Sequence, residues 1–280
     1  RNNGVSSLFN KIIPRLYKMA KYNDIDMNNW KQYDDIYTDT LWLIEKRDNS
    51  GAHTPMYHGN FVPQIPNQLL KRYTKKGDWI LDPFLGSGTS VIEAQRLERN
   101  SVGIELQAEV ATDAYHRIKS EKTSTCKERV YIGDSKTIDI KRIMNQNEIN
   151  CFQFILFHPP YWDIIRFSDN PDDISNSKTL DSFLKNFGMV IDNTMSYLEK
   201  NRYCAVVIGD KYANQELVPL GFYTMNLFMQ RGLKLKAILV KNFENTKGKT
   251  NQNAIWRYRA LASDFYIFKH EYIFIFKKMK

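Results

Sequence analysis

Residues 79–106 read WILDPFLGSGTSVIEAQRLERNSVGIEL, and this stretch decides the predicted fold. An apolar run ends at Asp82, and the turn Gly86-Ser87-Gly88 follows it. A helical pattern then covers residues 89–99, and a second apolar run ends at Glu105. Strand, glycine turn, helix, strand and terminal acid form the first βαβ unit of a doubly wound α/β sheet.

The turn and the acid predict a ligand site at the ends of these two strands. Glycine lets the backbone approach a ligand closely, and Glu105, 17 residues after Gly88, is placed to bind two ribose hydroxyls. A phosphate-binding P-loop is excluded because no Gly-Lys-Ser/Thr follows. The dinucleotide pattern GxGxxG fails because Val91 stands at its last position. A tight strand-to-helix turn without a ligand is the alternative.

A second motif, His158-Pro159-Pro160-Tyr161-Trp162, follows the apolar run 152–157. It therefore lies at the carboxyl end of another predicted strand, which is the edge where open parallel sheets bind ligands. Two successive prolines stiffen the loop and remove two N–H donors, so carbonyl groups are left free to accept. A rigid loop with buried aromatic side chains is the alternative, and the glycine turn in the same chain argues against it.

Together, DPFLGSGT (82–89) and HPPY (158–161) resemble the two signature motifs of the S-adenosylmethionine-dependent amino-methyltransferases, which methylate adenine N6 or cytosine N4 in DNA. The resemblance covers roughly residues 57–280. The family usually has Asp, Asn or Ser where this chain has His158. Many bacterial relatives place the two halves in the opposite order, so this chain is permuted relative to them. His270-Glu271-Tyr272 resembles the family's last motif.

The resemblance implies S-adenosylmethionine as the cofactor. Phe61 and Pro63 match a segment that packs against the methionine end of the cofactor in the family, and a surface loop with one buried Phe is the alternative. Asp134, after the predicted strand 128–132, matches the acid that contacts the adenine amino group, and a helix N-cap is its alternative role. The candidate cofactor-binding residues are Phe61, Pro63, Asp82, Pro83, Phe84, Gly86, Ser87, Gly88, Thr89, Glu105 and Asp134.

The resemblance also implies in-line methyl transfer from the cofactor sulfonium to the exocyclic amine of a flipped base. The His158 side chain and the Pro159 carbonyl correspond to the two acceptors of the amine, and Tyr161 corresponds to the residue that stacks on the base. Neutral histidine has one acceptor nitrogen, so we expect activity to fall as the pH drops through the His158 pKa. Adenine is slightly favoured over cytosine because adenine enzymes are the commoner group, and no metal is required. The candidate catalytic residues are His158, Pro159, Pro160 and Tyr161.

The composition suits a DNA partner. The chain has 280 residues, a formal net charge of +9 and a pI of about 9.2, which favour a polyanionic partner although a merely basic protein would also have them. Its three cysteines lack metal-ligand spacing, so we expect no disulfide or zinc site and a reducing, cytoplasmic location. No apolar run reaches the roughly 20 residues that span a membrane, and no signal peptide is visible.

Two segments are predicted to contact nucleic acid. Residues 163–179 are long and polar and directly follow the proposed catalytic loop, so they are expected to face the substrate. Residues 241–269 interleave basic and aromatic side chains, as nucleic-acid grooves do, and a solvated hairpin loop is the alternative. The candidate contacts are Arg166, Ser168, Lys247, Lys249, Trp256, Arg257 and Arg259.

The whole pattern predicts seven strands and about six helices. The last two strands lack a helical crossover, so they should pair antiparallel. This pattern resembles the mostly parallel, Rossmann-like sheet of class I methyltransferases, with an antiparallel final strand. We predict an N-terminal extension over 1–56 and a methyltransferase domain over 57–280. The alternatives are an RNA amino-methyltransferase and a non-catalytic nucleic-acid-binding subunit, and a restriction or specificity protein is a further candidate partner.

Overall fold

The predicted strands lie in one mixed sheet, which also includes an eighth strand from a segment that was compatible with either strand or helix (40–45). The computed structural model describes residues 22–121, 125–243 and 253–279. The strands are β1 (Leu41–Trp42), β2 (Trp79–Asp82), β3 (Asn100–Glu105), β4 (Glu128–Ile132), β5 (Phe152–Phe157), β6 (Leu198–Ile208), β9 (Lys234–Asn242) and β10 (His270–Lys277). A separate hairpin consists of β7 (Lys211–Ala213) and β8 (Glu216–Val218).

The strand order is β1-β9-β10-β6-β5-β2-β3-β4. Within the described residues, every strand pairing in this sheet is parallel except those of β10, which is antiparallel to both β6 and β9. The mostly parallel α/β fold with an antiparallel final strand is therefore confirmed. Because β10 runs backwards, its first residues lie at the same edge as the last residues of the parallel strands.

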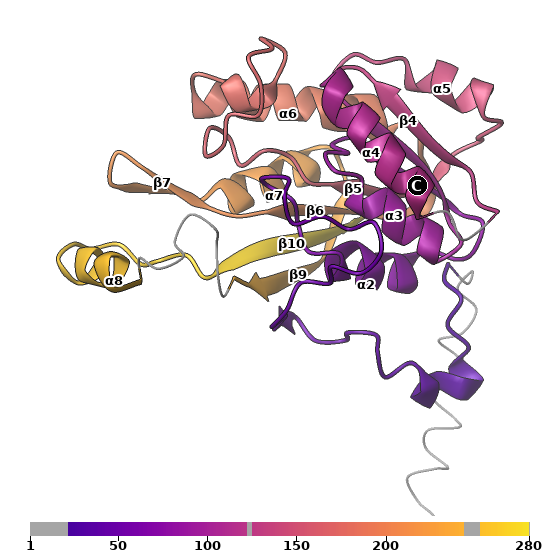
Figure 1. Ribbon diagram of the computed structural model, residues 1–280, viewed down its shortest axis with the longest axis horizontal. Coiled ribbons are helices and arrows are strands. Elements are labelled where there is room, and N and C mark those ends of the chain that lie inside the picture. Colours follow the sequence, from indigo (N-terminus) through magenta and orange to yellow (C-terminus); the bar gives the residue numbers. More distant parts are fainter. Residues whose placement is uncertain (1–21, 122–124, 244–252, 280) are drawn as a thin grey trace, which may run out of the picture.

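Helices cover both faces of the sheet (Figure 1). Strand β6 is buried on both of its faces. Cys204, Val206 and Ile208 belong to one buried cluster, whereas Ala205 and Val207, which lie between them, belong to another. This alternation is the period of two that a strand buried on both faces requires. The longer helices are α2 (Gln64–Tyr73), α3 (Thr89–Arg96), α4 (Ala108–Ser120), α5 (Ile140–Gln146), α6 (Leu180–Met195), α7 (Leu220–Gln230) and α8 (Asn253–Leu261), and the short 3₁₀ helices are η1 (Met27–Gln32) and η2 (Ile174–Asn176).

Several predicted element boundaries were wrong. The sequence predicts a helix over residues 135–147, but α5 begins at Ile140 because Asp139 caps it by accepting from the backbone N–H of Arg142 at 2.8 Å. The sequence predicts a strand over residues 203–208, but β6 begins five residues earlier because its first residue, Leu198, already pairs with β5. Residues 241–269, for which a solvated hairpin loop was the alternative interpretation, contain α8.

Residues 22–56 pack against the rest of the chain. Strand β1 pairs with β9, and Trp42 is buried in one of the core clusters. Arg47 donates to the carbonyl of Phe61 at 2.8 Å. The boundary between residues 56 and 57 stays a prediction. Among the described residues, no helix is both long and apolar enough to cross a bilayer.

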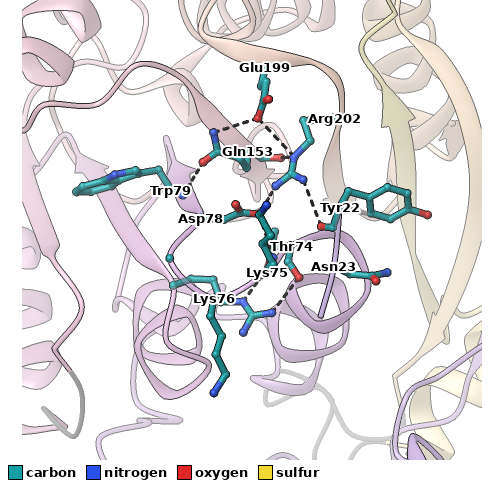
Figure 2. Close-up of polar contacts among 12 residues, drawn as sticks. Tyr22, Asn23, Thr74, Lys75, Lys76, Asp78, Trp79, Gln153, Glu199 and Arg202 are labelled. Carbon is teal, nitrogen blue, oxygen red and sulfur yellow. Dashed lines mark hydrogen bonds and ion pairs between the residues drawn. The ribbon is translucent and has the colours of Figure 1, made fainter. Parts of the chain in front are cut away.

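A buried ion pair ties the amino ends of the strands together (Figure 2). The Arg202 guanidinium on β6 contacts the carboxylate of Asp78, which directly precedes β2. Arg202 also donates to the carbonyls of Tyr22 and Gln153, and the Asp78 carboxylate accepts from the backbone N–H of Lys75 at 3.0 Å. These bonds link the described N-terminal residues, β2, β5 and β6.

Candidate active site

A pocket lies at the carboxyl ends of β2, β3 and β5, the edge predicted from the sequence. Including the space open to solvent at its mouth, the pocket measures about 630 Å³. The residues that line it are Tyr57, Gly59, Asn60, Phe61, Phe84, Leu85, Gly86, Ser87, Thr89, Glu105, Leu106, Gln107, His158, Pro159, Pro160, Phe167 and Asp173.

The glycine turn forms the floor of this pocket. Gly86 and Gly88 have φ angles of 50° and 87°, which favour glycine. A Cβ atom on Gly86 would lie 3.0 Å from the Tyr57 ring, so a side chain there would crowd the pocket wall. Gly88 caps α3 and packs against Ile118 rather than lining the pocket.

Asp82 stabilises the turn through hydrogen bonds to its carboxylate. Its carboxylate accepts from the backbone N–H of Phe84 at 2.9 Å and from the Ser90 hydroxyl. Burial raises the pKa of Asp82 to about 6, with a further contribution from the charge of Glu105. The structure thus places Asp82 beneath the pocket floor and outside the pocket lining.

Glu105 is one of two acids that line the pocket. Its two carboxylate oxygens accept from the backbone N–H groups of Gly86 at 2.9 Å and Gln107 at 3.0 Å. Burial raises the pKa of Glu105, whereas these backbone donors oppose the shift. A carboxylate oxygen can accept more than one hydrogen bond, so Glu105 retains acceptor capacity toward the pocket.

The Phe61 segment forms the wall beside the catalytic loop. The Phe61 ring centroid lies 4.5 Å from that of His158. Asn60 accepts from the Thr89 hydroxyl at 2.7 Å, which ties this wall to the start of α3. Pro63 caps α2 and is buried, but it does not line the pocket.

Two other cofactor candidates also lie outside the lining. The Pro83 carbonyl accepts from the Ser135 hydroxyl at 2.7 Å. The Asp134 carboxylate accepts from the Lys136 backbone N–H and pairs with its ammonium group at 3.4 Å. Asp134 does not cap a helix either, and its contact with the adenine amino group stays a prediction.

The 163–179 segment folds over the pocket. The Phe167 ring stacks on Tyr57 with centroids 6.2 Å apart, and both side chains line the cavity. Asp173 is buried, lines the pocket, and accepts from the Ser168 hydroxyl at 2.8 Å. Sequence analysis missed Tyr57, Phe167 and Asp173 because no local spacing distinguishes them from other loop residues.

The HPPY motif places His158 and both prolines in the pocket lining, but not Tyr161. The Tyr161 hydroxyl donates to the Glu271 carboxylate at 2.6 Å and lies 3.3 Å from His158 Nε2. Glu271 in turn pairs with Lys241 at 3.2 Å, and both are buried. Burial and the Lys241 charge lower the pKa of His158 to about 3.

Trp162, the last residue of the HPPYW motif, is held in an unusual conformation. Its φ angle is 53°, a rare value for a bulky side chain, and such outliers gather at functional sites. Its indole N–H donates to the Ser177 carbonyl at 2.8 Å, and the Lys211 ammonium lies 4.3 Å from its ring centroid. These contacts anchor the loop that follows the prolines.

The candidate nucleic-acid contacts are spread over two surfaces. Arg166 is exposed and pairs with Asp169 at 2.7 Å. Arg257 and Arg259 are exposed on α8, which Figure 1 shows standing apart from the sheet beyond β9 and β10. Arg259 lies 5.3 Å from the ring centroid of Trp256. Lys247 and Lys249 lie outside the described residues.

A cluster outside the pocket lining contains side chains of the types that bind metal ions, but these side chains are paired with one another and with an arginine. Asp48, His53 and Glu93 bring ligand atoms within 4.8 Å of one another. However, Arg96 lies 3.1 Å from Glu93 and 3.6 Å from Asp48, and His53 lies 2.6 Å from Glu93. These contacts hold the 48–53 segment against α3.

Comparison with known proteins agrees with the architecture of the pocket. The family model N6_N4_Mtase, described as a DNA methylase, matches residues 10–116, which include the glycine turn and Glu105. Over this stretch, the chain is similar to the N6/N4 DNA methylase family. The match begins earlier than the resemblance expected from the motifs and ends before HPPYW. This similarity implies S-adenosylmethionine as the cofactor.

Curated relatives of this methylase family match only part of the chain. The type II methyltransferase M2.DpnII of Streptococcus pneumoniae is 37% identical over 101 residues, 34% of this chain and 34% of that protein. M.Cfr9I of Citrobacter freundii is 35% identical over 85 residues, 30% of this chain and 27% of that protein. The matched stretch thus spans about a third or less of these relatives.

Solved structures share the fold over most of the chain. A methyltransferase from Pyrococcus furiosus has a TM-score of 0.50 and 12% identity, covering 81% of this chain and 88% of its own. A precorrin 8W decarboxylase from Methanobacterium thermoautotrophicum has a TM-score of 0.50 and 10% identity, covering 84% and 100% respectively. At these identities the likeness shows the fold alone.

Proposed function

We propose that this protein transfers a methyl group from S-adenosylmethionine to an exocyclic amino group of a base in DNA. One observation carries the proposal: the buried carboxylate of Glu105 and the His158-Pro159-Pro160 loop line the same pocket. The first group suits a ribose, and the second suits an amine. A pocket that unites both features fits group transfer between a nucleoside-containing cofactor and an amino group.

The residues present fit the cofactor. Glu105 offers acceptor capacity for two ribose hydroxyls, while its own position is fixed by two backbone N–H donors. Gly86 leaves room for close approach because a Cβ atom there would crowd Tyr57. The aromatic wall at Phe61 offers an apolar surface beside the catalytic loop. When bound, S-adenosylmethionine supplies an electrophilic methyl group on its sulfonium.

The catalytic loop supplies acceptors for the amine. An exocyclic amine is a poor nucleophile because its lone pair is delocalised into the ring, so its N–H groups must be held to orient that lone pair. His158 is held neutral by its low pKa and therefore offers an acceptor nitrogen. Pro159 contributes the second acceptor through its backbone carbonyl. Catalysis then depends chiefly on positioning.

The DNA substrate follows from charge and access. A base inside a duplex cannot reach a recessed pocket, so the target base must be flipped out at a cost of a few kcal/mol. The exposed arginines of α8 and the net charge of +9 suit the phosphate backbone. Adenine N6 is slightly favoured as the target, and cytosine N4 is the other candidate. A restriction or specificity protein is a proposed partner.

Tritiated methyl transfer tests this proposal. The protein is incubated with labelled S-adenosylmethionine and DNA, and the nucleosides are separated after digestion. Label in N6-methyladenine is the expected result, and label in N4-methylcytosine would retain the enzyme class but change the base. Label on RNA alone would favour the RNA amino-methyltransferase. No label in the presence of bound cofactor would overturn the activity and favour a non-catalytic subunit.

A further inference from the structure

The hydrogen bonds behind the HPPY loop form a continuous chain. Lys241 on β9 and Glu271 on β10 are direct partners in the antiparallel register, and their side chains pair at 3.2 Å. The Tyr161 hydroxyl donates to Glu271 at 2.6 Å and lies 3.3 Å from Nε2 of His158. The chain therefore runs from a buried ammonium group to a ring that lines the pocket.

The direction of each bond follows from which groups carry protons. The lysine ammonium has only donors, and an ionised carboxylate has only acceptors. The phenol has a single proton, and the short bond to the Glu271 carboxylate takes it. Burial and the Glu271 charge raise the pKa of Tyr161 well above its ordinary value, so the phenol keeps that proton.

The phenol oxygen can then only accept from His158. Neutral imidazole carries one N–H and one acceptor nitrogen, and the low pKa of His158 keeps the ring neutral. A proton on Nε2 points at the phenol oxygen, which leaves Nδ1 unprotonated. Nδ1 has no hydrogen-bond partner within the described residues and is not one of their fully buried unpaired polar atoms. Because His158 lines the pocket, the pocket is the place from which a ligand can reach an accessible Nδ1.

We propose that Lys241, Glu271 and Tyr161 form a relay that holds the proton of His158 on Nε2, so that Nδ1 accepts from the substrate amine. The substrate part of this inference rests on the proposed function, whereas the tautomer does not. Tyr161 is thereby a positioning residue. Its ring lies against Gly209, where an added Cβ would lie 3.0 Å from it, so the residue directly after β6 must be glycine to leave room for the ring.

Glu271→Gln tests the direction of the relay. Lys241 can only donate, so the new amide must turn its oxygen to Lys241 and its NH₂ group to Tyr161. The phenol would then accept from Gln and donate to His158 Nε2, which moves the imidazole proton to Nδ1. An N–H would face the substrate amine in place of a lone pair. We expect kcat to fall roughly 10- to 100-fold, with cofactor affinity unchanged.

The tautomer is read by ¹⁵N NMR of histidine-labelled protein, in which the chain's five histidines give few signals. The signal of His158 is the one lost in His158→Asn. We expect protonated Nε2 in the wild type and protonated Nδ1 in Glu271→Gln. The matched control is Glu128→Gln, because Glu128 is also buried and pairs with Lys119 at 3.3 Å, away from the pocket. That variant should leave the His158 signals unchanged.

A double-mutant cycle separates this role from a structural one. Asparagine at position 158 has a carboxamide oxygen and no tautomer to choose. Glu271→Gln should therefore change kcat less than about twofold in the His158→Asn background. An equal loss in both backgrounds would overturn the relay, as would protonated Nδ1 in the wild type or an unchanged tautomer in Glu271→Gln.

These measurements distinguish failure of the relay from failure of the proposed function. If the wild type transfers no methyl group but shows the predicted tautomer and its reversal, the relay stands and the proposed function fails. Should Glu271→Gln not fold, Tyr161→Phe removes the hydroxyl that accepts from His158 and donates to Glu271, and the His158 N–H proton should shift upfield. The control Tyr131→Phe removes a hydroxyl that bonds Asn147 at 2.7 Å and should not move that signal. An unmoved signal in Tyr161→Phe would contradict the relay.

Discussion

Two buried ion pairs lie at opposite edges of the same sheet. Arg202 and Asp78 join the amino ends of the strands (Figure 2), and Lys241 and Glu271 join the carboxyl edge. All four residues are less than 8% exposed. At the amino edge the other bonds of the pair go largely to backbone groups, namely the carbonyls of Tyr22 and Gln153 and the N–H of Lys75.

The carboxyl-edge pair differs in where its hydrogen bonds lead. Through Tyr161 they reach His158, which lines a pocket. Buried charge alone therefore does not identify a functional group, because structural ion pairs also perturb titration. The useful difference is whether the network closes on backbone groups or ends at a cavity.

The largest expected effect comes from removing one cation at each edge. Arg202→Met leaves the Asp78 carboxylate buried without its partner, so the free energy of unfolding should fall by about 3–5 kcal/mol. Lys241→Met leaves Glu271 in a similar position and should cost a similar amount. Urea unfolding measures both losses, and initial rates are corrected for the folded fraction. Only Lys241→Met should also lower kcat per folded molecule; an equal loss of kcat in Arg202→Met would remove the distinction between the edges.

The next effect tests the pocket end of the carboxyl-edge network. His158→Ala removes one of two proposed acceptors and should lower methyl transfer by about 10²–10³-fold, by analogy with the loss of one hydrogen bond from a transition-state site. The cofactor dissociation constant should stay within about twofold, because His158 faces the amine in the proposal. His116→Ala is the matched control, since His116 is exposed on α4. Normal turnover in His158→Ala would exclude the acceptor role.

Sequence analysis identified the parts of the pocket that lie on contiguous motifs. The glycine turn, Glu105 and the prolines follow directly after strands, and parallel strands bring their carboxyl ends to one edge. Residues that reach the pocket through loops, such as Asp173, were not predictable because loop paths depend on tertiary packing. Lys241 and Glu271 were missed as a pair because only the register of β9 against β10 places them together.

A smaller effect concerns the cofactor side of the pocket. Glu105→Gln replaces an acceptor-only carboxylate with an amide, whose NH₂ group must face either a backbone N–H or the proposed ribose. The cofactor dissociation constant should rise about 10- to 100-fold by calorimetry. Glu109→Gln, on the exposed surface of α4, is the control. Unchanged affinity in Glu105→Gln would show that this carboxylate does not bind the cofactor.

The smallest effect on turnover is expected from pH, because the lowered pKa of His158 moves the expected fall in activity below pH 5. With its pKa lowered to about 3, His158 is neutral throughout pH 5–8, so its titration should change kcat by less than about twofold in that range.

The free energy of unfolding should depend on pH through the same histidine. The unfolded chain binds a proton at this histidine near pH 6.5 and the folded chain does not, so this contribution to stability is complete above pH 6.5. It is lost as the pH falls toward 3, by up to about 1.4 kcal/mol per pH unit. His158→Asn should remove that slope from urea unfolding curves at pH 4–7, whereas His116→Asn should retain it. A slope unchanged by His158→Asn would mean that the ring titrates normally, and a loss of activity between pH 5 and 8 would then be its expected consequence.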